Sequence, residues 1–302
     1  MRPTLAALLL AGTIALGAPL AAAPAPQPVA PEARWFTVGS LHVAALHDAD
    51  FLVPNDGKTF GTDVGPAAVA DLLKVAGVPT DTIQISVNAL LVTLPGHVVL
   101  LDTGLGPMAD GKVAASLAAA GYAPAQITDV LITHSHGDHV GGLATAAGTP
   151  AFPNAKVRMS AAEWTFLQGN GGAAKLVAAI TPQVATFVPD TDVVPGIRAI
   201  TVAGHTPGHV TYQLTSGSAR LLDIGDSAHS AIISLAEPEW AMGFDSDQIV
   251  GKASRRALLT KLAASHEMIF SPHFPYPGVG TVEAHHGGFL WVPAAAGTFT
   301  AQ

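Results

Sequence analysis

The segment His134-Ser135-His136-Gly137-Asp138-His139 constrains this chain more than any other. It follows the apolar residues 130–133, which have the pattern of a buried strand. Neutral imidazole and carboxylate groups are the ligands that zinc and similar borderline cations select. Packing gives no reason for so many polar side chains at the end of a buried strand. The segment therefore predicts a metal site, and because one loop cannot surround an ion, further ligands must come from elsewhere in the chain.

The composition limits the classes of protein to which the chain can belong. Its 302 residues are 49% hydrophobic, which is enough for one large core or two modest ones. The net charge is −8 and Lys and Arg form no cluster, so the composition argues against nucleic-acid binding. The chain contains no cysteine, which excludes disulfides, thiolate metal ligands and a cysteine nucleophile.

The N-terminus has the pattern of a secretory signal. Arg2 precedes an apolar segment at residues 5–20, and alanines follow at 21–23. We expect residues 1–23 to be a signal peptide, 24–34 a Pro/Ala-rich leader and 35–302 a single folded domain, periplasmic or secreted. No apolar run of membrane-spanning length follows, so the mature protein is not expected to be membrane-embedded. An uncleaved anchor is the alternative, although the apolar segment is short for a span.

The remaining sequence alternates short β-type runs with Ala-rich helical windows, which predicts a mixed fold of helices and strands in one domain. A helix is expected to begin after Ser160, whose spacing to Glu163 is that of a capping box. A long helix is expected at about 247–264 with Ser246 as its cap. The other helices are expected at residues 66–75 and 112–120, and the strands at residues 41–46, 83–92, 98–101, 130–133, 157–159, 197–202, 210–214, 220–224 and 268–270.

Three other ligand-type residues follow apolar strands. His209 comes after the predicted strand at 197–202, Asp226 after the strand at 220–224, and His273 after the strand at 268–270. Loops that leave one edge of a sheet converge, so these side chains are expected near the first motif. His205 lies in the same loop as His209 and is expected to be structural.

This arrangement resembles the metallo-β-lactamase superfamily. The H-x-H-x-D-H motif of that family is matched in full by residues 134–139, and Leu101-Asp102-Thr103-Gly104 resembles its first motif. The resemblance implies an α+β fold, the four-layer αβ/βα sandwich, with two divalent metal ions, most simply Zn²⁺. It assigns His134, His136 and His209 to one metal, Asp138, His139 and His273 to the other, Asp226 as a bridge between them and Asp102 as a supporting residue behind a ligand.

Other features indicate a branch of this family. Asp226 in the bridging position and the absence of cysteine disfavour a dedicated β-lactamase, and the intact His136 disfavours the redox di-iron members. Segments 121–124 and 273–280 resemble the exported methyl parathion hydrolase-like branch, which includes lactonases. The resemblance implies a metal-dependent hydrolase of lactones, aryl esters or organophosphate triesters that attacks with a hydroxide between the metals, with Asp138 and Asp226 as catalytic carboxylates. A β-lactamase and a non-catalytic metal- or ligand-binding protein remain as alternatives.

The substrate pocket is harder to predict. Four aromatic residues are candidates for its apolar wall, and each is explained equally well as a core aromatic. His229, three residues past Asp226, is a candidate hydrogen-bond partner for a small uncharged substrate, with a structural role as the alternative. The sequence leaves open the preferred substrate, the native metals and the assembly state, including a homodimer. The four aromatic candidates are Phe51, Phe60, Trp164 and Phe166.

Overall fold

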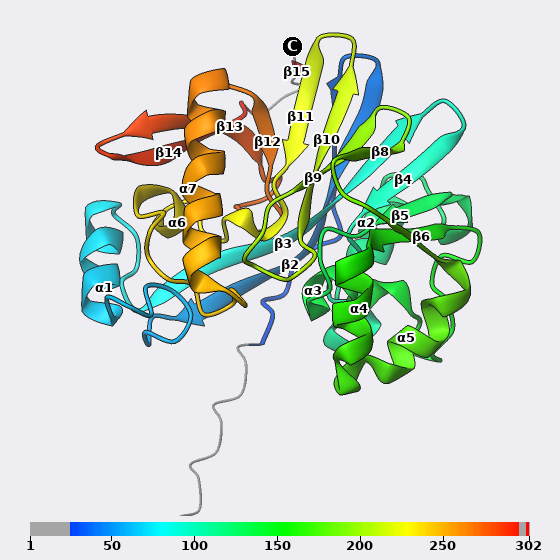
Figure 1. Ribbon diagram of the computed structural model, residues 1–302, viewed down its shortest axis with the longest axis horizontal. Helices are drawn as coiled ribbons and strands as arrows, with labels where there is room; N and C mark the ends of the chain where they lie inside the picture. Colours follow the sequence, from blue (N-terminus) through cyan, green and yellow to red (C-terminus); the bar gives the residue numbers. More distant parts are fainter. Residues whose placement is uncertain (1–24, 296–299, 302) are drawn as a thin grey trace, which may run out of the picture.

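A computed structural model describes residues 25–295 and 300–301 of the protein. Two β-sheets face each other, and helices cover their outer faces (Figure 1). The αβ/βα sandwich predicted from the sequence is confirmed. The expected signal peptide at residues 1–23 lies outside the described residues. Among the described residues, no helix combines the length and the apolar character needed to cross a bilayer.

The first sheet has eight strands in the order β15-β1-β2-β3-β4-β5-β6-β7. The strands from β1 to β4 pair antiparallel, whereas β4, β5, β6 and β7 pair parallel. The carboxyl ends of β4 and β5 therefore meet at one edge, where Asp102 and His134 follow them. The strands are β1 (Ala33–Val38), β2 (Leu41–Pro54), β3 (Thr82–Leu94), β4 (His97–Leu101), β5 (Asp129–Leu131), β6 (Lys156–Ser160), β7 (Val184–Phe187) and β15 (Thr300–Ala301).

The second sheet has seven strands in the order β14-β13-β12-β11-β10-β9-β8. Its one parallel pair joins β11 to β12, so the segments that carry Asp226 and His273 leave the sheet in the same direction. The strands are β8 (Thr191–Val194), β9 (Ile197–Thr201), β10 (Val210–Ser216), β11 (Ala219–Asp223), β12 (Met268–Phe270), β13 (Val279–His285) and β14 (Gly288–Pro293).

The helices begin close to the residues that the sequence indicated, with one correction. The cap of α7 is Asp247 rather than Ser246, because the Asp247 carboxylate accepts hydrogen bonds from the N–H groups of Ile249 and Val250. The helices are α1 (Pro66–Val75), α2 (Val113–Ala119), α3 (Gly137–Val140), α4 (Ala161–Gly169), α5 (Ala174–Ile180), α6 (Ile233–Ala236) and α7 (Gln248–Ser265).

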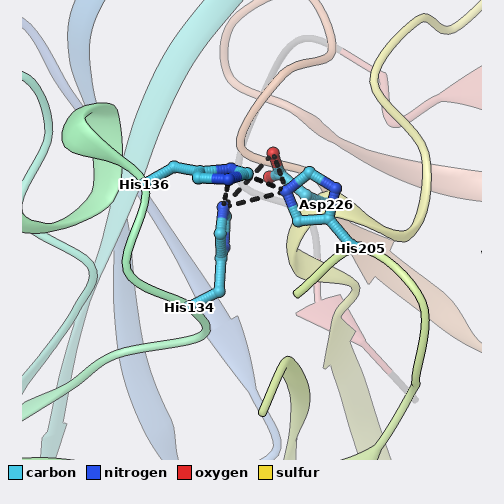
Figure 2. Close-up of side chains that lie close together, drawn as sticks. All are labelled: His134, His136, His205 and Asp226. Atoms are coloured by element: carbon cyan, nitrogen blue, oxygen red, sulfur yellow. Dashed lines mark hydrogen bonds and ion pairs between the residues drawn. The ribbon is translucent and has the colours of Figure 1, made fainter. Parts of the chain in front are cut away.

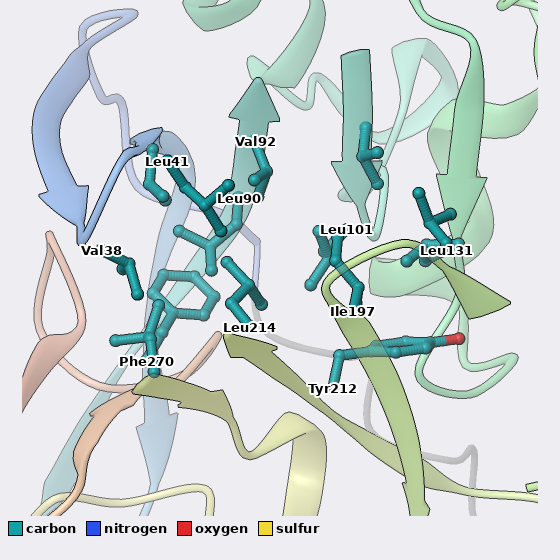
Figure 3. Close-up of a cluster of buried hydrophobic side chains, with 14 of the residues drawn as sticks. Val38, Leu41, Leu90, Val92, Leu101, Leu131, Ile197, Tyr212, Leu214 and Phe270 are labelled. Atoms are coloured by element: carbon teal, nitrogen blue, oxygen red, sulfur yellow. The ribbon is translucent and has the colours of Figure 1, made fainter. Parts of the chain in front are cut away.

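The largest core lies between the two sheets (Figure 3). Leu90 and Leu101 of the first sheet pack there with Leu214 and Phe270 of the second, all fully buried. A second apolar cluster lies between the first sheet and α2, α4 and α5, and a third lies between the second sheet and α7. Central strands buried on both faces explain why the sequence shows continuous apolar runs instead of alternation.

The proline-rich leader lies against the folded domain over part of its length. The Gln27 N–H donates to the Asp50 carbonyl at 2.6 Å, and the Glu32 N–H donates to Ser116 Oγ at 3.0 Å. Strand β1 then begins at Ala33, two residues before the expected start of the domain.

The core between the sheets supports a stability prediction. Leu214→Ala removes a fully buried side chain, so we expect the free energy of unfolding to fall by about 2–5 kcal/mol, measured by chemical denaturation. Leu290→Ala is the matched control, because Leu290 is 45% exposed and its truncation should cost far less. Equal losses in the two variants would contradict the assignment of this core.

Candidate metal centre

Four ligand-type side chains from both sheets converge at the edge of the sandwich (Figure 2). His134 and His136 come from the loop after β5, His205 from the loop between β9 and β10, and Asp226 from the segment after β11. One ligand atom from each lies within 4.8 Å of the others. This first ligand group therefore has the dimensions of a metal site.

A second ligand group lies beside the first. It consists of Asp138 and His139, at the start of α3, and His273, which follows β12, again with ligand atoms within 4.8 Å of one another. The Nε2 atoms of His139 and His273 are 3.4 Å apart. Both sheets thus contribute to both groups.

The first group fits a cation because its imidazole nitrogens point at one another. His205 Nε2 lies 2.9 Å from His136 Nδ1 and 3.1 Å from His134 Nε2, and the latter two atoms are 3.1 Å apart. On the outer side, His205 Nδ1 lies 3.0 Å from a carboxylate oxygen of Asp245. That bond places the proton of His205 on Nδ1 and leaves the Nε2 lone pair facing inward, as in a metal-ligating histidine.

The second group is arranged in the same way. His273 Nδ1 donates to the Ser86 carbonyl at 2.8 Å, and His139 Nδ1 donates to an Asp102 oxygen at 2.8 Å. Their Nε2 atoms therefore face the site, where each neutral ring can offer a lone pair to a cation. Nitrogen and carboxylate donors of this kind suit zinc and neighbouring divalent cations, so the residues present fit two such ions.

Asp226 lies between the two groups. One of its oxygens is 3.3 Å from His205 Nε2 and 3.1 Å from His273 Nε2, and the other is 3.2 Å from His139 Nε2. Burial acts to raise its pKa, but His273 and His139 outweigh burial and hold the pKa well below its usual value. The carboxylate is therefore ionised, and it has the position of a bridge.

The histidines of the site differ in the direction in which their pKa is shifted. It lowers the pKa of His205 to about 3 and the pKa of His134 well below its usual value, so both rings are neutral at neutral pH. Burial also opposes protonation of His139 and His273, but the carboxylates of Asp226 and Asp138, joined at His139 by Asp102, together outweigh burial and raise the pKa of both rings. The histidine rings of the second group are therefore more strongly coupled to the carboxylates of the site than those of the first group.

Asp102 supports the second group from a strained position. Its φ of 58° is in the left-handed region, which is uncommon for a residue with a side chain. Its oxygens accept hydrogen bonds from the Thr133 N–H and hydroxyl at 2.9 and 2.7 Å, besides the one from His139. The supporting role expected of Asp102 stays a prediction, and these hydrogen bonds are the contacts through which it would act.

The expectation for His209 is wrong, and so is the one for His205. His209 lies outside both ligand groups because its two nitrogens are already engaged. Its Nε2 accepts a hydrogen bond from the Asp226 N–H at 3.0 Å, and its Nδ1 donates to the Val202 carbonyl at 2.9 Å. His209 thus holds the backbone of Asp226 in place, while His205, expected to be structural, places its Nε2 in the first ligand group.

Glu163 is a buried site residue that the sequence did not reveal. Its N–H bonds to Ser160 Oγ at 3.1 Å, as a helix cap predicts, but its carboxylate turns into the protein. The carboxylate accepts hydrogen bonds from the Ser135 N–H at 2.7 Å, the Thr206 hydroxyl at 2.7 Å and the Gly208 N–H at 3.0 Å. It therefore ties the two histidine-bearing loops together, whereas the capping-box spacing indicated a purely local role.

The four aromatic residues expected to line the pocket lie elsewhere in the fold than His229. Phe60 is buried in the core beside α1 with Phe51 packed against it, and Trp164 packs against the core below α4. Phe166 is 38% exposed on α4. None of these four rings contacts a histidine of the site directly, but the Phe60 ring lies 6.4 Å from the ring of Phe244, which packs against His229.

His229 does belong to the ring cluster around the ligands. Its ring lies 4.9 Å from His205 and 5.7 Å from His273, and the residue is 1% exposed. Neither ring nitrogen has a hydrogen-bond partner, although Nε2 lies 3.2 Å from an Asp226 oxygen. The ring of Phe244, 41% exposed and not anticipated from the sequence, lies 5.2 Å away on the outer side.

Known proteins are similar to this chain in sequence and in fold. YobT, an uncharacterized protein of Bacillus subtilis, is 29% identical over 171 residues, which are 52% of this chain and 70% of YobT. The structure of AidC, a dizinc quorum-quenching lactonase in complex with a product, superposes with a TM-score of 0.82 at 26% identity, covering 88% of this chain and 98% of AidC. The hydrolase AbOPH of the β-lactamase superfamily gives a TM-score of 0.80 at 29% identity, covering 89% and 99%.

The family model described as the metallo-beta-lactamase superfamily matches residues 83–273, which contain every residue of both ligand groups. With the sandwich, the histidine motif and the convergent ligand groups, this match shows that the chain belongs to the metallo-β-lactamase superfamily of metal-dependent hydrolases.

Proposed function

We propose that the protein is a dinuclear metal-dependent hydrolase that opens small uncharged lactones, with aryl esters and organophosphate triesters as further substrates. The observation that carries this proposal is the position of Asp226 between two adjacent ligand groups. The similarity to a dizinc lactonase over almost the whole folded chain supports two Zn²⁺ ions and a lactone substrate.

The chemistry of the site follows from its donors. Two bound divalent cations would lower the pKa of water to about 7 and polarise the oxygen of the substrate's electrophilic group. Asp138 is, like His136, only partly buried, with 30% of its side chain exposed, so its carboxylate is placed to accept a proton and pass it to an alkoxide leaving group. Aryl leaving groups need less help of this kind, which explains why one site would accept several substrate classes.

His229 and Phe244 suit an uncharged substrate. The unpartnered ring nitrogens of His229 are placed beside the ligand groups, where one N–H can donate to a substrate oxygen. Phe244 offers an apolar, partly exposed face directly outside His229. A polar donor at the ligands with an apolar wall outside it matches a cyclic ester that carries an apolar substituent.

Substrate profiling tests this proposal. Zinc-loaded protein should hydrolyse an acyl lactone faster than an aryl ester, a phosphotriester and the β-lactam nitrocefin, and the chelator-treated protein should lose this activity until zinc is restored. His205→Ala serves as the inactive control, because it removes a ligand atom of the first group. Nitrocefin as the fastest substrate would instead support a β-lactamase, and metal-independent or absent turnover of the panel would refute the hydrolase.

The role of His229 is tested separately. His229→Ala should reduce kcat/KM for the lactone by about 10- to 100-fold, the equivalent of one hydrogen bond of about 1.5–3 kcal/mol to the negative charge that develops on the substrate oxygen, while the bound metal per protein stays constant. His42→Ala is the matched control, since His42 is exposed on β2. Unchanged kinetics in His229→Ala, or loss of metal from it, would argue against a substrate-binding role.

A further inference from the structure

We propose that Arg255, on the buried face of α7, is a positioning residue that sets the geometry of the first ligand group. The inference rests on the proposed metal site and concerns how tightly that site holds its cation. Arg255 is 1% exposed and heads the fully buried side chains by size. A charge so deep in a protein is costly unless it is paired and every donor is satisfied.

The guanidinium group of Arg255 joins three segments. Its Nε donates to the Ser227 carbonyl at 3.1 Å, and Nη1 donates to the carbonyls of Pro238 and Trp240 at 2.9 and 3.0 Å. Nη2 donates to Asp245 Oδ2 at 2.7 Å. Only the planar fork of arginine can reach all these acceptors at once, because lysine offers a single nitrogen.

Two of these contacts lead directly to the first ligand group. The second oxygen of Asp245 lies 3.0 Å from His205 Nδ1, so Arg255 orients the carboxylate that in turn orients the His205 ring. Ser227 follows Asp226 in the chain, so the bond to its carbonyl fixes the backbone beside that carboxylate. One side chain of α7 therefore holds both His205 and Asp226.

The Asp245 carboxylate lies in a confined space between α7 and the His205 ring. A cavity of about 10 Å³, lined among others by His205, Asp226, Asp245 and Arg255, lies behind the ligands. Helix α7 approaches closely at Gly251, where a Cβ atom would lie 2.7 Å from Asp245 Oδ2. The cavity and the close approach of α7 both adjoin Asp245, so the orientation of the His205 ring is coupled to the Asp245 carboxylate and through it to Arg255.

Metal binding in three variants tests the proposal. In Arg255→Lys, Arg255→Met and Asp245→Asn, we expect one of the two bound cations to lose about 10- to 100-fold in affinity, as is usual when a partner behind a ligand is removed. Affinity is measured by competition with a chromophoric chelator for Zn²⁺. The absorption spectrum of the Co²⁺-substituted protein should change as well, which a loss of stability alone would not cause. Arg256→Met is the matched control, because Arg256 is the exposed neighbour and contacts Gly287.

The outcomes separate this inference from the proposed function. If the parent binds two cations and the folded variants bind them with parental affinity and parental Co²⁺ spectra, the role of Arg255 is refuted and the proposed function stands. If the parent binds no cation, both are refuted. Should the Arg255 variants fail to fold, Asp245→Asn decides, because it preserves the size of the side chain while removing the charge that pairs with Arg255 and one of the two acceptor oxygens.

Discussion

The site depends on the hydrogen bonds that its histidines make on the side facing away from the ligand atoms. Asp245 takes the outward nitrogen of His205, and Asp102 takes that of His139. In the neutral ring each bond leaves the inward nitrogen free to bind a cation, and nitrogens that converge in a buried place suit a cation between them. Asp226 lies where the two groups meet and supplies the negative charge that such cations balance.

The sandwich brings distant segments of the chain together at one edge of the two sheets. Parallel pairing of β4 with β5 places Asp102 behind the histidine motif, and parallel pairing of β11 with β12 brings Asp226 and His273 together. The apolar core between the sheets fixes the two halves of the site relative to each other. Rigid strands supporting short loops give the precision that a metal centre needs.

Much of this architecture could be predicted from the sequence. Apolar runs followed by ligand-type residues located the strands and most of the site, because strand ends are where side chains converge. The choice between His205 and His209 could not be made, since both stand in one loop and only the hydrogen bonds of the folded chain show that His209 is engaged by Asp226 and Val202. The burial and the role of Arg255 could not be predicted either, because a lone arginine on an amphipathic helix has no local pattern that marks it as buried.

Anomalous diffraction from crystals grown with zinc tests the proposed two-cation site most directly. We expect two peaks roughly 3.5–4 Å apart with Asp226 between them, one of them bonded to His205 Nε2 and neither to His209. A single peak, or a peak bonded to His209 in place of His205, would contradict it.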